Sequence, residues 1–126
     1  MMRTMNKPAL LLFAHGSGDP AWAEPFERIR DSVQQSRPGM PVALAYLERM
    51  TPSFSEGVAQ LVASGATEVT VAPLFLAPGG HVKNDLPRLA EAASRQHGVA
   101  IRVLSSLGES SAMIEAIAGW AIEQAG

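Results

Sequence analysis

The sequence contains no cysteine among its 126 residues. Disulfide bonds, iron–sulfur clusters and thiolate nucleophiles are therefore excluded, and any transition-metal site has to use histidine together with carboxylate or water. Charge is also sparse, because only 17% of the residues are charged and no run of lysine or arginine occurs. Nucleic-acid backbones are bound by concentrated positive charge, so we expect no nucleic-acid partner.

Long hydrophobic runs are missing as well. The apolar stretch from Ala9 to Phe13 is too short to span a bilayer, and no convincing cleavage site follows it. We therefore predict a cytoplasmic protein with no membrane partner. Hydrophobic residues make up 47% of the chain, enough to build a core. Domains most often contain roughly 100–150 residues, so we expect residues 1–126 to form a single domain.

Four short apolar runs are present in the chain. They are continuously rather than alternately hydrophobic, which is typical of strands buried on both faces of a parallel sheet. These runs cover residues 9–13, 42–47, 69–76 and 99–104. Pro73 cannot donate a hydrogen bond to a neighbouring strand, so we place it near the end of its strand.

Segments with helical periodicity lie between and after the apolar runs. Apolar residues recur at the 3.6-residue spacing in four stripes, which start at Trp22, Phe54, Leu86 and Met113. The expected N-caps, each followed by a first-turn proline, are Asp19-Pro20 and Thr51-Pro52. The expected helix-ending glycines are Gly65 and Gly98.

This alternation predicts an α/β fold with an open four-stranded parallel sheet, helices on both faces and right-handed crossovers. If the strand order is the flavodoxin-like 2-1-3-4, the topological switch point lies between the first and third strands. Ligands of open α/β sheets bind at the carboxyl ends of the strands that flank this point. The segments that would line the crevice are residues 14–20 and 77–85.

Each of these segments carries a histidine in a glycine-rich turn, namely His15 and His81. Glycine lets the backbone turn sharply and lets a flat ligand approach, and a neutral imidazole suits Co²⁺, Ni²⁺, Fe²⁺ or Zn²⁺. A single loop histidine often only caps its loop, but two at one switch point favour a metal site. His97 instead lies at a helix end, where imidazole complements the helix dipole.

Other polar residues near the crevice are weaker candidates. Glu48 directly follows the second strand and could ligate a metal, accept a proton or simply begin a solvated loop. Ser17 lacks the context of an activated nucleophile, and Asp19 is typical of a helix cap. Basic residues near the same rim could meet substrate carboxylates, although solubilising charge is their commoner role; they are Arg49, Lys83 and Arg88.

A nucleotide or FMN site has little support. The segment from Gly16 to Ala21 lacks both the third glycine of the dinucleotide-binding loop and the lysine of the Walker loop.

Three motifs together resemble a known family. His15-Gly16-Ser17 with Asp19-Pro20, then Tyr46-Leu47-Glu48, then the block from Pro73 to Pro87 containing Gly79-Gly80-His81-Val82-Lys83, are similar to the short CbiX-type class II chelatases. These enzymes are sirohydrochlorin cobaltochelatases related to the sirohydrochlorin and protohaem ferrochelatases. The resemblance covers nearly the whole chain.

The resemblance implies a chelatase-like fold and insertion of Co²⁺ into sirohydrochlorin, in cobalamin or sirohaem biosynthesis. It implies metal binding by His15 and His81, with Glu48 as a possible third participant, no prosthetic group, and Co²⁺, Fe²⁺ or Ni²⁺ as substrate. We expect the tetrapyrrole to contact Ser17, Gly79, Gly80 and Lys83. Because larger relatives carry two such domains in one chain, a homodimer is implied.

One position departs from the family pattern, because Gly18 stands where arginine is usual. A contact to a substrate carboxylate is therefore in question. A non-catalytic carrier of metal or tetrapyrrole would share every motif named above, and only a measurement of turnover distinguishes it from an enzyme.

Overall fold

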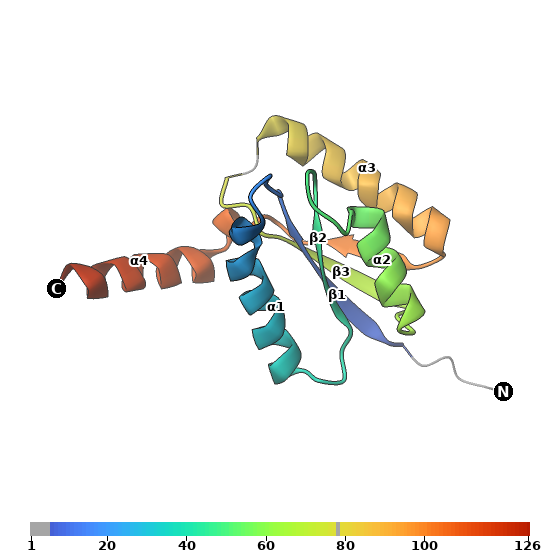
Figure 1. Cartoon of the computed structure of the whole chain (residues 1–126), viewed down its shortest axis with the longest axis horizontal. Helices are drawn as coiled ribbons and strands as arrows, with labels where there is room; N and C mark the ends of the chain where they lie inside the picture. The colour runs from blue at the N-terminus through green and yellow to red at the C-terminus, as the bar shows by residue number, and fades with distance from the viewer. Residues whose placement is uncertain (1–5, 78) are drawn as a thin grey trace.

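The computed structural model describes residues 6–77 and 79–126, except for the side chain of residue 81. Its strands are β1 (Pro8–Ala14), β2 (Val42–Tyr46), β3 (Glu68–Pro73) and β4 (Ala100–Val103). Its α-helices are α1 (Glu24–Ser36), α2 (Phe54–Ala63), α3 (Gly80–His97) and α4 (Ser111–Ala125), and two short 3-10 turns are η1 (Pro20–Ala23) and η2 (Leu107–Glu109) (Figure 1).

The four strands form one parallel sheet in the order β2-β1-β3-β4. This confirms the predicted strand order and places the switch point between β1 and β3. Pro73 is the last residue of β3 and pairs with Phe13. Its missing N–H therefore falls where the ladder ends, as expected from the sequence.

Helices cover both faces of the sheet. On one face, α2 and α3 pack over a core whose innermost side chains are Leu11, Phe13, Leu61, Val58, Val69 and Val71. On the other face, α1 and η1 enclose a smaller cluster centred on Leu12, Leu44 and Tyr46. The alternation of inward and outward residues along β1 explains why each of its faces joins a different cluster.

The fourth helix does not cover the sheet, which contradicts the packing that its apolar stripe suggested. Every residue of α4 is exposed, and Figure 1 shows the helix projecting away from the rest of the molecule. Helical periodicity specifies that a face is apolar, but it does not specify which surface covers that face.

Helix ends follow the predicted chemistry with one exception. Asp19 caps η1 by accepting a hydrogen bond from the Ala21 N–H, and Gly98 adopts the left-handed conformation after α3. The prediction of Thr51 as the cap of α2 is wrong, because the helix begins only at Phe54. Ser53 is the cap and forms a reciprocal capping box with Glu56.

None of the helices within the described residues is both long enough and apolar enough to cross a membrane.

Candidate functional site

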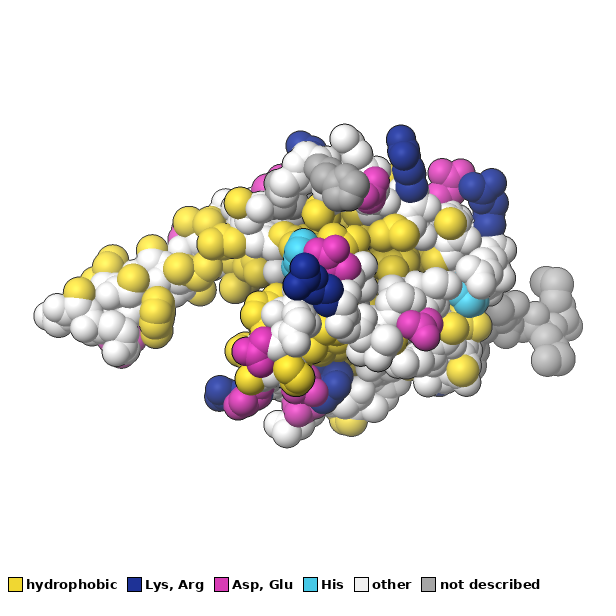
Figure 2. All heavy atoms as spheres, turned by 45° about the horizontal axis from the view of Figure 1, so that its top comes forward, with side chains coloured by type: hydrophobic (Ala, Val, Ile, Leu, Met, Phe, Trp, Pro, Cys, Tyr) yellow, Lys and Arg dark blue, Asp and Glu magenta, His cyan; other side chains and the backbone are white. Residues whose placement is uncertain are grey.

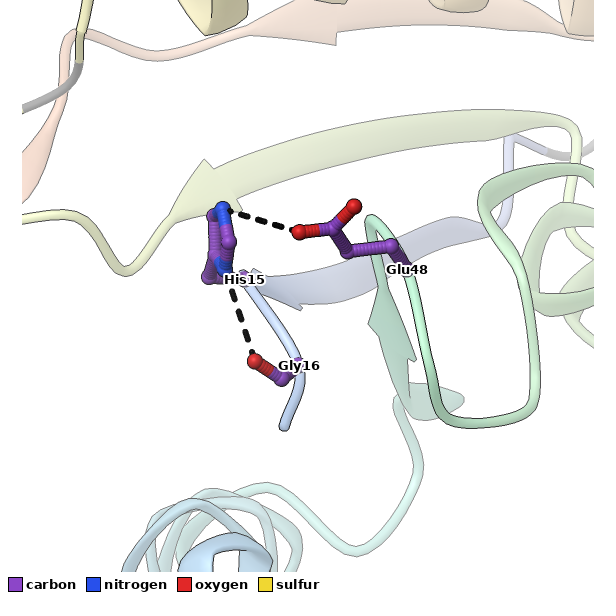
Figure 3. A network of polar contacts seen from close by, with 3 residues as sticks. All are labelled: His15, Gly16 and Glu48. Carbon is purple, nitrogen blue, oxygen red and sulfur yellow. Dashed lines mark hydrogen bonds and ion pairs between the residues drawn. The ribbon is translucent and has the colours of Figure 1, made fainter. Parts of the chain in front are cut away.

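His15 and Glu48 are brought together because the pairing of β1 with β2 continues past the ends of both strands. The Leu47 N–H donates to Ala14 O at 2.9 Å, and the Glu48 N–H donates to His15 O at 3.1 Å. The two side chains extend from neighbouring backbones and meet, with His15 Nε2 3.5 Å from Glu48 Oε1 (Figure 3). The predicted placement of Glu48 at the carboxyl-end edge is therefore what the structure shows.

Gly16 makes this close approach possible. Its φ of +98° lies in the region that favours glycine, and a Cβ at this position would overlap the carbonyl oxygen of Glu48. Because residue 16 has no side chain, the loop after β1 can lie this close to the loop after β2.

Each ring nitrogen of His15 faces an oxygen. Nδ1 lies 3.4 Å from Gly16 O and Nε2 lies 3.5 Å from Glu48 Oε1, and each contact is a hydrogen bond only where that nitrogen carries a proton. Because Nδ1 faces the backbone, Nε2 is the nitrogen that a metal ion would bind. An N–H held by a backbone carbonyl, with the other nitrogen free, is the usual arrangement of a metal-binding histidine.

The separation of the two groups fits a shared metal ion. Ligands that each lie about 2.1 Å from a metal are about 3.4 Å apart at a tetrahedral angle. The observed 3.5 Å between Nε2 and Oε1 is close to this value. Both side chains are about half exposed, at 49% and 53%, so a metal ion can reach them from solvent.

This pair supplies only two ligands. Within residues 6–77 and 79–126, leaving aside the side chain of residue 81, no group of three or more His, Cys, Asp or Glu side chains is placed to hold a metal ion. Further ligands would have to come from water, from a bound substrate, or from side chains beyond this set.

Phe75 forms one wall of the site, a role that the sequence analysis missed. Its ring meets the His15 ring edge to face, with centroids 6.4 Å apart. It also lines a small groove of about 150 Å³ together with Val82 and Lys83 of α3. The sequence signal for this role was an aromatic residue two positions after Pro73, the end of β3, which flanks the switch point.

The predicted loop over residues 77–85 is only partly a loop, because α3 already begins at Gly80. Gly79 is the extended N-cap, and the Lys83 N–H donates to its carbonyl oxygen at 3.1 Å. His81 is the second residue of α3, but its side chain lies outside the described part of the structure. Among the described atoms, a Cβ on Gly79 or Gly80 would meet nothing within 4 Å, so these atoms leave open space beside both glycines.

Arg49 occupies the neighbourhood of Gly18. A Cβ built on Gly18 would lie 3.7 Å from Arg49 Nη1, and both residues line an open pocket of about 520 Å³ together with Ser17. Arg49 holds a φ of +66°, which is uncommon for a residue with a side chain. The Ser17 hydroxyl accepts a hydrogen bond from the Asp19 N–H, a local turn contact.

Two further candidates lie elsewhere. His97 was expected only to complement the dipole at the end of its helix. In the structure its Nε2 lies 3.2 Å from the Ser55 hydroxyl, so the ring connects α3 to α2. Arg88 lines a groove of about 380 Å³ beside Tyr46. The Tyr46 ring itself lies on the other face of the sheet, beside Trp22. There burial raises the pKa of Tyr46, Glu27 adds to this effect and Arg30 opposes it.

Comparison with known proteins identifies close relatives. A family model described as CbiX matches residues 9–123. The CbiX protein of Marinobacter aquaeolei VT8 is 34% identical with a TM-score of 0.82, over 93% of this chain and 96% of that one. The sirohydrochlorin cobaltochelatase of Methanothermobacter thermautotrophicus is 36% identical over 83 residues, which is 66% of this chain.

A larger relative is the sirohydrochlorin chelatase SirB of Bacillus subtilis subspecies spizizenii in complex with cobalt. It is 30% identical with a TM-score of 0.65, over 82% of this chain but only 45% of SirB. The matched region likewise spans 57% of the Methanothermobacter protein. The chain therefore spans little more than half the length of the curated relatives that it matches.

Proposed function

Because the chain belongs to the CbiX family, we propose that it inserts a divalent metal ion, Co²⁺, into sirohydrochlorin. The observation that carries this proposal is the pairing of His15 Nε2 with Glu48 Oε1 at 3.5 Å, at the carboxyl ends of β1 and β2. Two relatives support it, since one is a sirohydrochlorin cobaltochelatase and the other is a sirohydrochlorin chelatase in complex with cobalt.

In this proposal His15 Nε2 binds the incoming metal ion, and Glu48 either adds an oxygen ligand or accepts a proton. Metal insertion requires two pyrrole N–H protons to leave while the metal sheds water. A carboxylate or a neutral imidazole close to the metal can accept such a proton near neutral pH. Holding the metal against one face of the macrocycle adds the advantage of proximity. His81, from the first turn of α3, is the proposed second histidine.

The tetrapyrrole would be held by residues around this pair. The open space beside Gly79 and Gly80 leaves room for a flat macrocycle, and Lys83 lies one turn further along α3. Ser17 and Arg49 line the same pocket. We propose that Arg49 supplies there the positive charge that the family usually provides from residue 18. A guanidinium can bind a carboxylate with two parallel hydrogen bonds.

We also propose that the active form is a homodimer. The match to SirB covers 45% of that chain, so two copies of the present chain correspond to its length. His15 and Glu48 are about half exposed, and a second copy would cover them from the opposite side.

The test is a spectrophotometric insertion assay with sirohydrochlorin and Co²⁺, Ni²⁺ or Fe²⁺ in anaerobic buffer. Imidazole and carboxylate alone do not choose among these metals, so the rates are compared side by side. We expect His15→Ala, His81→Ala and Glu48→Gln to lower the rate about 100-fold or more. His97→Ala is the matched control and should retain the wild-type rate.

Two outcomes would contradict the proposal. If both His15→Ala and His81→Ala kept the wild-type rate, the assigned mechanism would be wrong. Stoichiometric binding of metal or tetrapyrrole without any acceleration of insertion would instead identify a carrier.

A further inference from the structure

A groove of about 380 Å³ lies between α3 and the segment that joins β2 to α2. Its deepest lining side chains are Phe13 and Phe54, which are 0% and 3% exposed. Leu47, which also lines it, directly precedes Glu48, and Phe13 lies two residues before His15. The lining of this α2–α3 groove therefore begins within about 7 Å of both candidate metal ligands along the backbone.

A row of aromatic rings joins the groove to the candidate metal site. The Phe13 ring meets Phe54 and Phe75 edge to face, with centroids 5.2 and 5.9 Å apart, and Phe75 meets His15 in the same way. Edge-to-face packing is a favoured geometry of aromatic pairs. Figure 2 shows hydrophobic side chains exposed in the middle of this side of the molecule, with charged side chains of both signs around them. The groove thus has an apolar interior at a fixed position relative to His15.

One face of α3 forms a wall of the groove. Its lining residues are Asp85, Arg88, Leu89 and Ala92, which are spaced i, i+3, i+4 and i+7 and therefore share a face. Other residues of α3 supply its contribution to the core. The helix consequently presents two apolar side chains and two charged ones to the groove.

The polar groups of the groove are engaged within the protein, except for one. The hydroxyls of Ser53 and Ser55 form hydrogen bonds with neighbouring groups of α2 and α3. Asp85 is half-buried and has an interaction partner of its own. Arg88 is exposed, and in the described part of the chain no ion pair or side-chain hydrogen bond involves it. Its guanidinium is therefore available to a ligand.

Two other basic residues are placed around the metal site in a comparable way. Arg49 lines the pocket of about 520 Å³ beside the loop after β1, and Lys83 lines the groove of about 150 Å³ beside Phe75. Each of the three cavities adjoins the carboxyl-end edge of the sheet, and each is lined by one basic side chain. Separate positive charges around one metal site match a ligand that carries several carboxylates on its periphery.

We infer that the α2–α3 groove receives one edge of the tetrapyrrole and that Arg88 binds a carboxylate on that edge. This assignment rests on the proposed function and deepens it, because it makes Arg88 a specificity-determining residue. Sirohydrochlorin carries acetate and propionate groups around its macrocycle, so its carboxylates can meet Arg49, Lys83 and Arg88 together. A planar guanidinium binds a carboxylate through two parallel hydrogen bonds.

The size and lining of the groove agree with this occupant. Sites for small molecules have volumes of about 300–1,000 Å³ and combine apolar walls with a few polar groups that fix orientation. The groove lies near the lower end of this range, which suits one edge of a macrocycle that extends over the metal site. Phe13 and Phe54 offer apolar contact to a pyrrole ring, and Arg88 offers the polar contact.

The first test is tetrapyrrole binding without metal, followed by absorbance and fluorescence. Arg88→Ala should raise Kd for sirohydrochlorin and for uroporphyrin about tenfold, the loss expected for one charge-assisted contact. Arg88→Lys keeps the charge but not the paired hydrogen bonds, and should raise Kd about threefold. The effect of Arg88→Ala should shrink between about 0.01 M and about 1 M salt, because salt screens the attraction. The preference for uroporphyrin over mesoporphyrin should also fall, since mesoporphyrin carries propionates on neighbouring rings only.

Two further variants complete this test. Arg95→Ala is the matched control, because Arg95 is an exposed arginine in the last turn of the same helix and pairs with Glu91. It should bind as tightly as wild type. Ala92→Trp fills the groove at an exposed position without changing its charge, and should weaken binding to a similar extent at every salt concentration.

Three outcomes would overturn the inference. The first is a Kd for sirohydrochlorin that neither Arg88→Ala nor Ala92→Trp changes. The second is a loss in Arg88→Ala that is independent of salt and equal for both porphyrins, since it would mean that Arg88 acts on the fold and not on carboxylates. The third is a change of solution mass in light scattering with unchanged tetrapyrrole affinity, which would show that another copy of the chain covers the groove.

Metal insertion is measured on the same samples. Binding that depends on Arg88 but is not followed by insertion would refute the proposed function and leave the inference standing. Insertion by Arg88→Ala with the wild-type KM would refute the inference alone.

Discussion

Replacing Gly16 by alanine tests the contact on which the candidate site depends. At a φ of +98°, a side chain costs about 1–3 kcal/mol of backbone strain. The new Cβ would also overlap the carbonyl oxygen of Glu48, and relieving such overpacking costs typically about 1–3 kcal/mol. The Glu48 backbone cannot move freely because its N–H is bonded to His15 O. We therefore expect Gly16→Ala to lower the unfolding free energy by about 3 kcal/mol.

The assays are urea denaturation and thermal denaturation, both followed by circular dichroism, together with calorimetric titration of Co²⁺. A loss of about 3 kcal/mol corresponds to a fall of about 10 °C in melting temperature for a domain of this size. Co²⁺ affinity should fall as well, because the backbone shift separates His15 from Glu48.

Gly18→Ala is the matched control in the same loop. Its Cβ would make only an ordinary contact, at 3.7 Å from Arg49 Nη1, and its φ is not positive. This variant should stay within about 0.5 kcal/mol of wild type. Equal stability of Gly16→Ala and wild type would refute the reasoning, since it would mean that the two loops do not approach as closely as the structure shows.

Three further predictions concern the substrate contacts and the helices. Arg49→Ala should raise KM for sirohydrochlorin about tenfold with little change in kcat, as steady-state rates would show; an unchanged KM would remove Arg49 from the substrate site. Gly57→Ala should lower the free energy of unfolding by about 1–3 kcal/mol, because its Cβ would lie 2.8 Å from Leu11 Cδ1. Urea denaturation measures this loss, and an unchanged urea midpoint would show that α2 can shift on the sheet. Hydrogen bonds from Ser53 lower the pKa of Glu56, so its carboxylate stabilises the fold above its ordinary pKa of 4.5 and this effect is lost as the pH falls. Glu56→Gln should therefore be less stable than wild type near neutral pH, by a difference that shrinks as the pH falls below 4.5, and a stability difference that does not change with pH would contradict this.

The layout of the fold was predictable because it depends on local patterns. Continuous apolar runs identified all four strands, and their alternation with helices implied a parallel sheet. The order β2-β1-β3-β4 was one assumption among possible orders, and the structure confirms it. The end of β3 at Pro73 follows from one missing N–H. The cap of α2 was misplaced, because Ser53 and Glu56 form a reciprocal pair whereas Thr51 lies before the helix.

The sequence indicated candidate site residues but not their contacts. Glycine-rich turns after the first and third strands pointed to His15 and His81; the structure places His15 beside Glu48, and the side chain of His81 lies outside the described part of the chain. The approach of Glu48 to His15, the neighbourhood of Arg49 and Gly18, and the wall formed by Phe75 all join segments that are distant in sequence. Such contacts depend on how loops pack, which no local pattern specifies.

The sequence by itself therefore determined the α/β class, the sheet and the pair of histidine-bearing segments, because hydrophobic periodicity, proline and glycine act through short-range geometry. Only the tertiary structure showed that Gly16 lets two loops touch and that α4 leaves its own sheet bare. Gly16 approaches the carbonyl oxygen of Glu48 and Gly108 of η2 approaches that of Leu76, so both features depend on backbone atoms that meet across the fold. Hydrophobic periodicity predicted that α4 carries apolar side chains, but it did not specify where this helix lies.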